Sequence, residues 1–320
     1  MLFEKLILNV YKSRMFKRYD DEGTAFYFSA EDFNELKKTP FSFKTKRGNT
    51  LQGYFYFYEN SIPDRLVIFD HGMGGGHRSY MREIELIAKK GYKVFSYDHT
   101  GCMESEGDTV YGFATSLADL DSAVIALKNT EEYKNMKISV IGHSWGAYAV
   151  QNICALHSDI THVIAISGPV SVKAMIDQYF GGILKYYRQA IMRLEMQENP
   201  DYVGFDAVNA LRSSNAKILI IHSKDDKMVK KEYHFDLLEN ALKDKENVRF
   251  LLVDGKRHNP NYTREAVIYL NEYLAELANK TKKGELSTHQ AKRAFIEKFD
   301  WHKMTEQDET VWSEIFKALE

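Results

Sequence analysis

Six short, unbroken apolar runs constrain the fold of this chain more than any other feature. They occupy residues 66–69, 92–97, 138–141, 163–166, 218–221 and 250–253. Such runs are typical of strands in a parallel sheet, because helices cover both faces of the sheet. Segments with helical spacing lie between them, as with Leu117, Leu120, Val124 and Leu127. The alternation predicts an α/β fold with a doubly wound, mostly parallel sheet.

Two further segments, 41–47 and 51–58, precede these runs and are separated by Gly48-Asn49. This pattern predicts an antiparallel hairpin through which the chain enters the sheet. With the six runs, the hairpin predicts a sheet of about eight strands. The spacing of Val267, Leu270 and Leu274 predicts a helix after the last strand.

The interval between the fourth and fifth runs is too long for a single crossover helix. Residues 170–215 are also rich in large apolar side chains. We predict an inserted helical cap over the carboxyl edge of the sheet, because a plain surface excursion would not need so many large apolar groups. The candidate substrate-binding residues in this cap are Met175, Tyr179, Phe180 and Tyr186.

The predicted organisation has four parts. They are an N-terminal helical extension (1–40), an α/β core (41–169 and 216–280), the cap (170–215) and a C-terminal helical extension (281–320). In the last part, a capping box starting at Ser287 predicts one helix, with Ala291, Ala294 and Phe295 facing inward. A second helix follows, and the pair packs on the core or on a second subunit. The oligomeric state stays undefined by the sequence.

The first helix is predicted over residues 2–18. One side carries the apolar residues and the other the basic ones: Leu2, Phe3, Leu6, Ile7 and Val10 lie opposite Lys5, Lys12, Arg14 and Lys17. A basic amphipathic helix can lie on a membrane surface, but docking on the body of the protein is the favoured interpretation. Glu4 and Lys5 interrupt the apolar stretch, which is unlike a signal peptide.

The overall composition excludes several classes of protein. A formal net charge of -2 shows no excess of basic residues of the kind that binds nucleic acid. The two cysteines, Cys102 and Cys154, define no disulfide framework. We therefore expect a cytoplasmic protein that binds no nucleic acid. Neither H-E-x-x-H nor a Cys/His cluster at ligand spacing occurs, so we expect neither a metal nor a cofactor.

The strongest chemical signal is the segment Gly142-His143-Ser144-Trp145-Gly146, which follows one predicted strand and precedes a helix. In this context G-x-S-x-G places a serine hydroxyl on a sharp turn above the sheet. The backbone N–H of Trp145 then points toward a developing oxyanion. The alternative is a serine that only caps a helix. His143 lies inside the turn and is expected to point away from a substrate.

A glycine-rich loop follows the first apolar run. It reads Asp70-His71-Gly72-Met73-Gly74-Gly75-Gly76. A loop of this kind can supply a second oxyanion donor, here the N–H of Met73. A phosphate-binding loop is the competing interpretation, but the G-K-[ST] ending is missing.

These two motifs and the run of strands resemble the α/β-hydrolase superfamily, and within it the esterase, monoglyceride lipase and serine aminopeptidase-like branch. The resemblance covers residues 41–280 and implies a triad in the order Ser, acid, His. Residues 222–229 resemble the family's acid loop, and alignment on Val229 favours Asp226 over Asp225. Residues 254–260 resemble the family's G-x-x-H loop, which supplies His258.

A further loop, 98–105, resembles the family's D-x-R-G-x-G-x-S segment. Thr100 stands in place of the arginine and Met103 in place of the second glycine.

The resemblance and the motifs predict hydrolysis through an acyl-enzyme on Ser144, with His258 as base and Asp226 orienting it. The apolar cap favours a small to medium hydrophobic ester as the small-molecule acyl substrate. Three alternatives stay open: an aminopeptidase-like enzyme, a membrane-associated lipase and a non-catalytic binding protein. The first needs an acid in the cap for a free amine. Glu195, Glu198 and Asp201 are the candidates.

Overall fold

Eight strands form one sheet in the computed structural model, which describes residues 2–320. Met1 of the predicted N-terminal extension lies outside the described residues. The strand order is β1-β2-β4-β3-β5-β6-β7-β8, and all neighbours from β4 to β8 are parallel. β1 and β2 form an antiparallel hairpin, and β2 pairs antiparallel with β4. The predicted doubly wound, mostly parallel sheet is therefore confirmed.

The strands begin and end within a few residues of the predicted runs. They are β1 (Lys37–Lys44), β2 (Thr50–Phe57), β3 (Arg65–Asp70), β4 (Lys93–Tyr97), β5 (Lys137–His143), β6 (His162–Ile166), β7 (Lys217–Ser223) and β8 (Val248–Val253). The agreement is close because the middle strands are buried on both faces, so burial selects apolar residues at most of their positions.

Twelve α-helices occur within residues 2–320. They are α1 (Leu2–Met15), α2 (Met81–Lys89), α3 (Thr115–Lys128), α4 (Trp145–Asn152), α5 (Val172–Tyr179), α6 (Arg188–Glu198), α7 (Ala207–Ser213), α8 (Phe235–Leu242), α9 (Arg264–Lys282), α10 (His289–Ile296), α11 (Trp301–Met304) and α12 (Glu309–Leu319). Short 3₁₀ helices are η1 (Ala30–Asp32), η2 (His77–Tyr80), η3 (Ile153–Ala155), η4 (Gly182–Tyr187) and η5 (Lys231–Tyr233).

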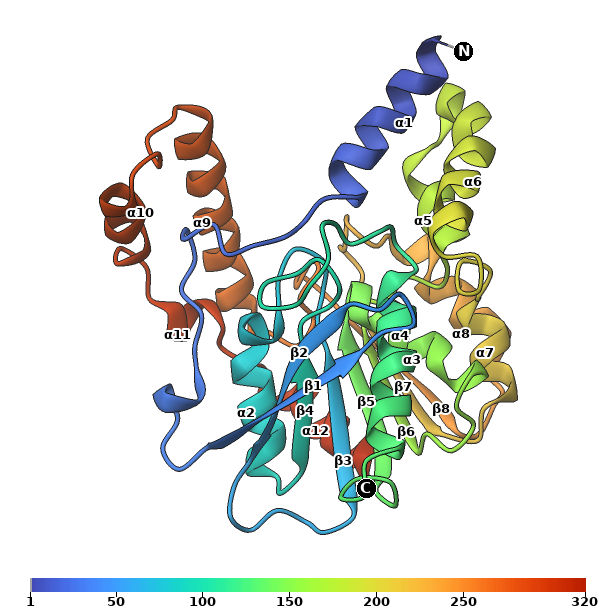
Figure 1. Ribbon diagram of the computed structural model, residues 1–320, viewed down its shortest axis with the longest axis vertical. Helices are drawn as coiled ribbons and strands as arrows, with labels where there is room; N and C mark the ends of the chain where they lie inside the picture. The colour runs from blue at the N-terminus through green and yellow to red at the C-terminus, as the bar shows by residue number, and fades with distance from the viewer. Residues whose placement is uncertain (1) are drawn as a thin grey trace.

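The helices cover the sheet in two layers (Figure 1). α3, α4, α7 and α8 share one apolar core with one face of the sheet. α2 and α12 share a second core with the opposite face, where α12 contacts β6 and β7. No helix within residues 2–320 is both long and apolar enough to cross a membrane.

The packing of the C-terminal helices does not follow the boundary predicted at residue 280. That boundary stays a prediction. α12 lies beyond that boundary, yet its Val311, Trp312 and Ile315 are buried against the sheet. α9 lies before it and packs on α10 and α11 around Tyr273, away from the sheet. The apolar stripe of α12 explains why this helix packs on the sheet. α12 buries five apolar residues and α9 three, and burial of apolar surface is favourable.

Two details of the predicted α10 are wrong. Thr288, and not Ser287, caps this helix, because the Thr288 side chain accepts the N–H of Ala291. Ala294 is exposed, whereas Phe295 is buried as the spacing predicts. The hydroxyl residues are adjacent, so the sequence pattern does not separate them.

The segment 170–215 folds into α5, η4, α6 and α7. In Figure 1, α5 and α6 project from the carboxyl edge of the sheet, and α1 rises beside them. Ile7, Leu8, Tyr11 and Met15 of α1 pack against the main core. Phe3, Leu6 and Val10 stay exposed. Docking on the body therefore uses only part of the apolar surface of α1.

Candidate active site

Ser144 lies at the turn between β5 and α4, in a conformation that L-residues rarely adopt. Its φ is 57° and its ψ is -113°. The neighbouring glycines make room for this turn, because a Cβ on Gly146 would lie 2.1 Å from the carbonyl oxygen of Asp70. A Cβ on Gly142 would lie 2.5 Å from the backbone of Gly146. The spacing of the motif thus follows from close backbone packing.

Three side chains from three separate loops meet at this turn. The Oγ of Ser144 lies 2.8 Å from Nε2 of His258. The Nδ1 of His258 lies 2.8 Å from Oδ2 of Asp226. The side chain of Asp226 is fully buried, and that of His258 is 12% exposed. The structure therefore brings together the hydroxyl, imidazole and carboxylate that the sequence singled out.

Asp225 and Asp226 have different partners. Oδ1 of Asp226 accepts the N–H groups of Met228 and Val229, which leaves Oδ2 for His258. Asp225 instead accepts the hydroxyl of Ser223 and the N–H of Arg257. Asp225 thus holds the backbone beside His258.

The electrostatics of Asp226 favour its ionised form. Burial raises the pKa of this carboxyl, but the hydrogen bond and charge of His258 outweigh burial. The N–H of Val229 and the nearby His222 lower it further. The net pKa lies below the usual range, so Asp226 is a carboxylate at neutral pH.

The ring of His143 lies 4.9 Å from the ring of His258 and joins three loops. Its Nε2 donates to the carbonyl oxygen of His258 at 2.8 Å. Its Nδ1 then accepts from the hydroxyl of Tyr80, also at 2.8 Å. The same hydroxyl accepts the N–H of Gly72. Burial, followed by the proximity of His258, lowers the pKa of His143 to about 3, so its ring is neutral and this donor order holds.

The glycine-rich loop passes directly beside Ser144. A Cβ on Gly72 would lie 2.6 Å from the Tyr80 hydroxyl and 3.4 Å from Cβ of Ser144. Met73 follows in a turn, half-buried against the main core. Trp145 is the first residue of α4, so its N–H has no acceptor within the helix. Both predicted oxyanion donors therefore belong to segments that adjoin Ser144.

A buried charged network supports this loop from below. His99 lies 2.7 Å from Asp70 and 3.2 Å from Asp119, and all three side chains are at most 2% exposed. Burial alone would lower the pKa of His99, but the two carboxylates raise it to about 10. A charged imidazolium thus bridges the end of β3 to α3. The sequence interpretation missed this role, although His99 directly follows Asp98 at the end of a buried strand.

His71 completes the same network. Its Nδ1 donates to the carbonyl oxygen of Gly72, and its Nε2 accepts the N–H of His99. Burial and the charge of His99 lower the pKa of His71 to about 3. His71 therefore holds the glycine-rich loop against the segment that begins at His99.

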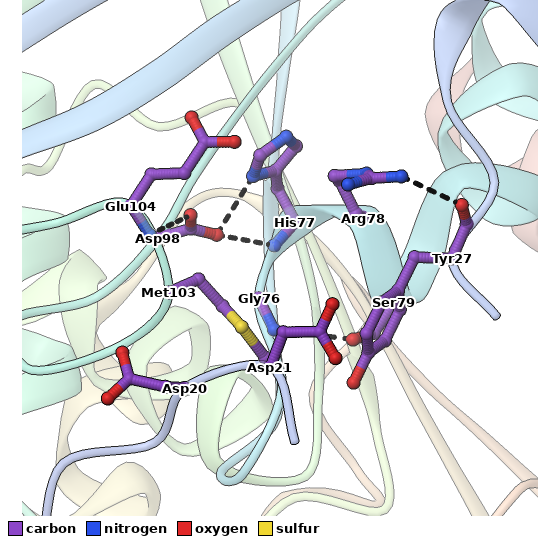
Figure 2. A pocket seen from close by; sticks show the side chains of 10 residues that line it. All are labelled: Asp20, Asp21, Tyr27, Gly76, His77, Arg78, Ser79, Asp98, Met103 and Glu104. Carbon is purple, nitrogen blue, oxygen red and sulfur yellow. Dashed lines mark hydrogen bonds and ion pairs between the residues drawn. The ribbon is translucent and has the colours of Figure 1, made fainter. Parts of the chain in front are cut away.

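A small pocket lies on the far side of this loop (Figure 2). His77 and Asp98 form its floor, where Asp98 accepts both the N–H and the Nδ1–H of His77. Asp20, Asp21 and Glu104 line its rim. Because Ser144 and His258 are not among its lining residues, the pocket does not contain the candidate site.

The loop 98–105 is held by a residue outside the resembling segment. Arg18 donates to the carbonyl oxygens of Met103, Ser105 and Gly107. This side chain clamps a loop in which Thr100 replaces the arginine of the family pattern. Thr100 itself hydrogen-bonds Asp119. The N-terminal extension is thereby part of the scaffold of the site.

The four predicted substrate-binding residues occupy different surroundings. Tyr179 is 54% exposed, and its hydroxyl donates to Met228 in the Asp226 loop. Phe180 contacts Tyr11 edge-on, and Met175 packs against the main core. Tyr186 is 75% exposed. Their role toward a substrate stays a prediction.

Comparisons with known proteins show what this chain is similar to. Residues 61–204 match the family model described as serine aminopeptidase, S33. Over 123 residues, 38% of the chain and 44% of the relative, the chain is 29% identical to a monoglyceride lipase homolog of Monkeypox virus. The chain is thus similar to the serine aminopeptidase, S33 family over residues 61–204 and shares the fold of an α/β-hydrolase esterase.

Another group of relatives carries the name of a different activity. A proline iminopeptidase of Lactobacillus helveticus is 28% identical over 167 residues, 47% of the chain and 55% of the relative. The chain therefore spans about half the length of these curated relatives. An esterase of Pyrococcus furiosus shares the fold, with a TM-score of 0.58, 20% identity, and coverage of 81% of this chain and 96% of its own.

Proposed function

We propose that this protein is a serine hydrolase that cleaves carboxylic esters through an acyl-enzyme intermediate. The observation that carries the proposal is the continuous chain from Ser144 through His258 to Asp226, with 2.8 Å at each link. A hydroxyl, a base and an orienting carboxylate in this order are what nucleophilic acyl transfer requires.

In the proposed reaction, His258 accepts the proton of Ser144 as its oxygen attacks the substrate carbonyl. Asp226 fixes the tautomer of His258 and stabilises the imidazolium that forms. The N–H groups of Trp145 and Met73 stabilise the oxyanion. The alcohol leaves with the proton from His258, and water then cleaves the acyl-enzyme with His258 again as base.

The surroundings of the cap acids favour an ester over a peptide with a free amine. Glu195 is fully buried and accepts hydrogen bonds from the Tyr11 hydroxyl and the N–H of Phe113. Glu198 pairs with Arg47. Two of the three candidate acids thus already have partners in the protein. A hydrophobic ester of small to medium size fits the apolar side chains of the cap.

The test is a matched pair of substrates and one variant. We expect wild-type protein to hydrolyse nitrophenyl esters, to react with a fluorophosphonate at Ser144 and to leave aminoacyl-arylamides intact. Ser144→Ala should lose both ester hydrolysis and labelling while keeping its unfolding midpoint. Faster cleavage of the arylamides would favour the peptidase suggested by the proline iminopeptidase relative. Absence of labelling and turnover in wild-type protein would contradict catalysis altogether.

A further inference from the structure

The most exposed apolar side chains of the chain gather at one end of the molecule. We define the tip as residues 2–17 together with residues 172–197, which form α1, α5, η4 and most of α6. In Figure 1 these helices project together from the carboxyl edge of the sheet. Among the side chains of residues 3–320, the three most exposed large apolar ones all lie there: Ile183 (79%), Tyr186 (75%) and Phe3 (72%).

The apolar stripe of α1 is wider than the part of it that packs against the rest of the protein. Tyr11 faces the body, where its hydroxyl donates to Glu195 and its ring contacts Phe180. Phe3, Leu6 and Val10 lie on the adjoining side of the helix and are 47–72% exposed. A helix that only docked on its own protein would not need this second, exposed set.

The tip is also strongly basic, whereas the chain is not. Its residues include eight lysines and arginines against three acids, a formal charge of +5, while the whole chain carries -2. The other residues therefore carry -7. The three acids of the tip are already counted in this charge: Glu195 is buried, and Asp177 pairs with Lys173 and Arg188 inside the tip.

Most of these basic side chains reach solvent beside the apolar ones. Seven are exposed, and they are Lys5, Lys12, Arg14, Lys17, Lys173, Lys185 and Arg193. Large apolar groups flanked by exposed lysine and arginine match the boundary between anionic headgroups and acyl chains. We propose that the tip binds the surface of an anionic lipid membrane.

Charge argues against a second copy of the chain at this surface. A symmetric pair places the same patch of both subunits together. Two tips of +5 each would then face one another, and like charges in one interface disfavour association. An acidic soluble protein would satisfy the charge, but it would leave the most exposed apolar groups, such as Ile183 and Phe3, without a matching environment.

The inference goes beyond hydrolysis and does not depend on it. If the proposed function is also correct, the tip would hold the cap beside a lipid phase in which hydrophobic esters dissolve. Vesicle binding can be measured with Ser144→Ala protein, which lacks the proposed nucleophile and keeps the tip. Failure of catalysis and failure of membrane binding are thereby separate outcomes.

The experiment is co-sedimentation of the full chain with vesicles of two compositions. One is phosphatidylcholine alone, and the other contains about one third phosphatidylglycerol. We expect a partition coefficient at least about tenfold higher on the anionic vesicles, and a decrease when salt rises from about 0.1 M to about 0.5 M. Equal binding to both compositions, or none to either, overturns the proposal.

A charge variant and its control test the basic part of the surface. The variant combines Lys5→Gln, Lys12→Gln and Arg14→Gln. The control removes three exposed lysines elsewhere, by Lys224→Gln, Lys243→Gln and Lys282→Gln. We expect the variant to lose at least about tenfold in anionic-vesicle binding and the control to lose less than threefold, roughly. Equal losses would assign the effect to net charge and overturn the specific surface.

An apolar variant tests the other part. It combines Phe3→Gln, Leu6→Gln and Val10→Gln, because glutamine keeps the helix propensity of α1. The control substitutes three exposed apolar residues outside the tip, by Leu237→Gln, Ile268→Gln and Leu274→Gln. Reduced vesicle binding in the variant alone supports the proposal. A dimer that dissociates in this variant, without vesicle binding in wild-type protein, assigns the surface to a second copy and overturns it.

Discussion

The cluster of loops around Ser144 and the tip lie at the same edge of the sheet, but they are held by different forces. Around Ser144, buried polar groups form chains of hydrogen bonds, as in Gly72–Tyr80–His143 and Asp70–His99–Asp119. At the tip, α1 meets the insertion through one hydrogen bond, between Tyr11 and Glu195, and through apolar packing.

The difference follows from what each region has to do. Acyl transfer requires reacting groups fixed to a fraction of an ångström, and directional hydrogen bonds supply that precision. A surface that meets other molecules needs exposed side chains in place of internal bonds. We therefore expect substitutions near Ser144 to change the rate of catalysis steeply. Substitutions at the tip should have little effect on catalysis and should instead change the pH dependence of stability or the binding of partners.

The two adjacent aspartates give the sharpest contrast within the loop cluster. Asp226→Asn should lower kcat for a soluble ester by about 10⁴, because an amide disfavours the tautomer of His258 that accepts the Ser144 proton. Asp225→Asn keeps an oxygen for the N–H of Arg257 and should lose less than about tenfold. Steady-state kinetics check both. Equal losses of kcat in the two variants would contradict the proposed role of the hydrogen bond between Asp226 and His258.

Substitutions at two glycines test how much extra volume the loops around Ser144 and the tip each tolerate. Gly146→Ala should destabilise the fold by about 3 kcal/mol or more, because the new Cβ would overlap the backbone of Asp70. Gly181→Ala, next to η4, adds a Cβ with no atom within 4 Å and should change stability by less than about 1 kcal/mol. Urea unfolding midpoints measure both, and a Gly146→Ala protein as stable as wild type would contradict the close contact.

Glu195 makes the stability of the protein depend on pH, with a sign that follows from its raised pKa. Burial raises the pKa of its carboxyl to about 7, although the Tyr11 hydroxyl and the N–H groups of Phe113 and Ala114 lower it in part. The folded state then binds more protons than the unfolded state between about pH 4.5 and 7, so stability falls as pH rises through this window. We expect a loss of about 2 kcal/mol from this group.

Glu195→Gln removes the titrating group and should reduce the difference in stability between pH 5 and pH 8 by that amount. Glu83, whose pKa burial also raises to about 7, titrates in both proteins and cancels in the comparison. Urea unfolding at the two pH values measures the change. An unaltered pH difference in the variant would show that Glu195 titrates normally.

Tyr80→Phe should have the smallest effect, about tenfold in kcat with little change in KM. The variant removes the acceptor for the N–H of Gly72 and the donor to His143 without touching the substrate. Tyr273→Phe, which loses a hydrogen bond to Thr24 far from Ser144, serves as the control and should keep full activity. A rise in KM alone would instead place Tyr80 in substrate binding.

The sequence predicted the strands well and the supporting contacts poorly, for physical reasons. A strand buried on both faces must be apolar throughout, so 66–69 and 163–166 mark β3 and β6 directly. His99 bonds Asp119, 20 residues along the chain, and Tyr80 bonds His143, 63 residues along, and no local pattern encodes such pairs. α9 and α12 both carry apolar stripes, and only packing decides which one covers the sheet.

By itself, the sequence determined the alternation of strands and helices and the residues at the strand ends, because burial and tight turns restrict residue types locally. The resemblance already favoured Asp226 over Asp225, but only the tertiary structure placed the Asp226 carboxylate against His258, enclosed Glu195 between Tyr11 and Phe113, and left part of α1 uncovered. These outcomes depend on contacts between distant segments, whose geometry exists only after the chain has folded.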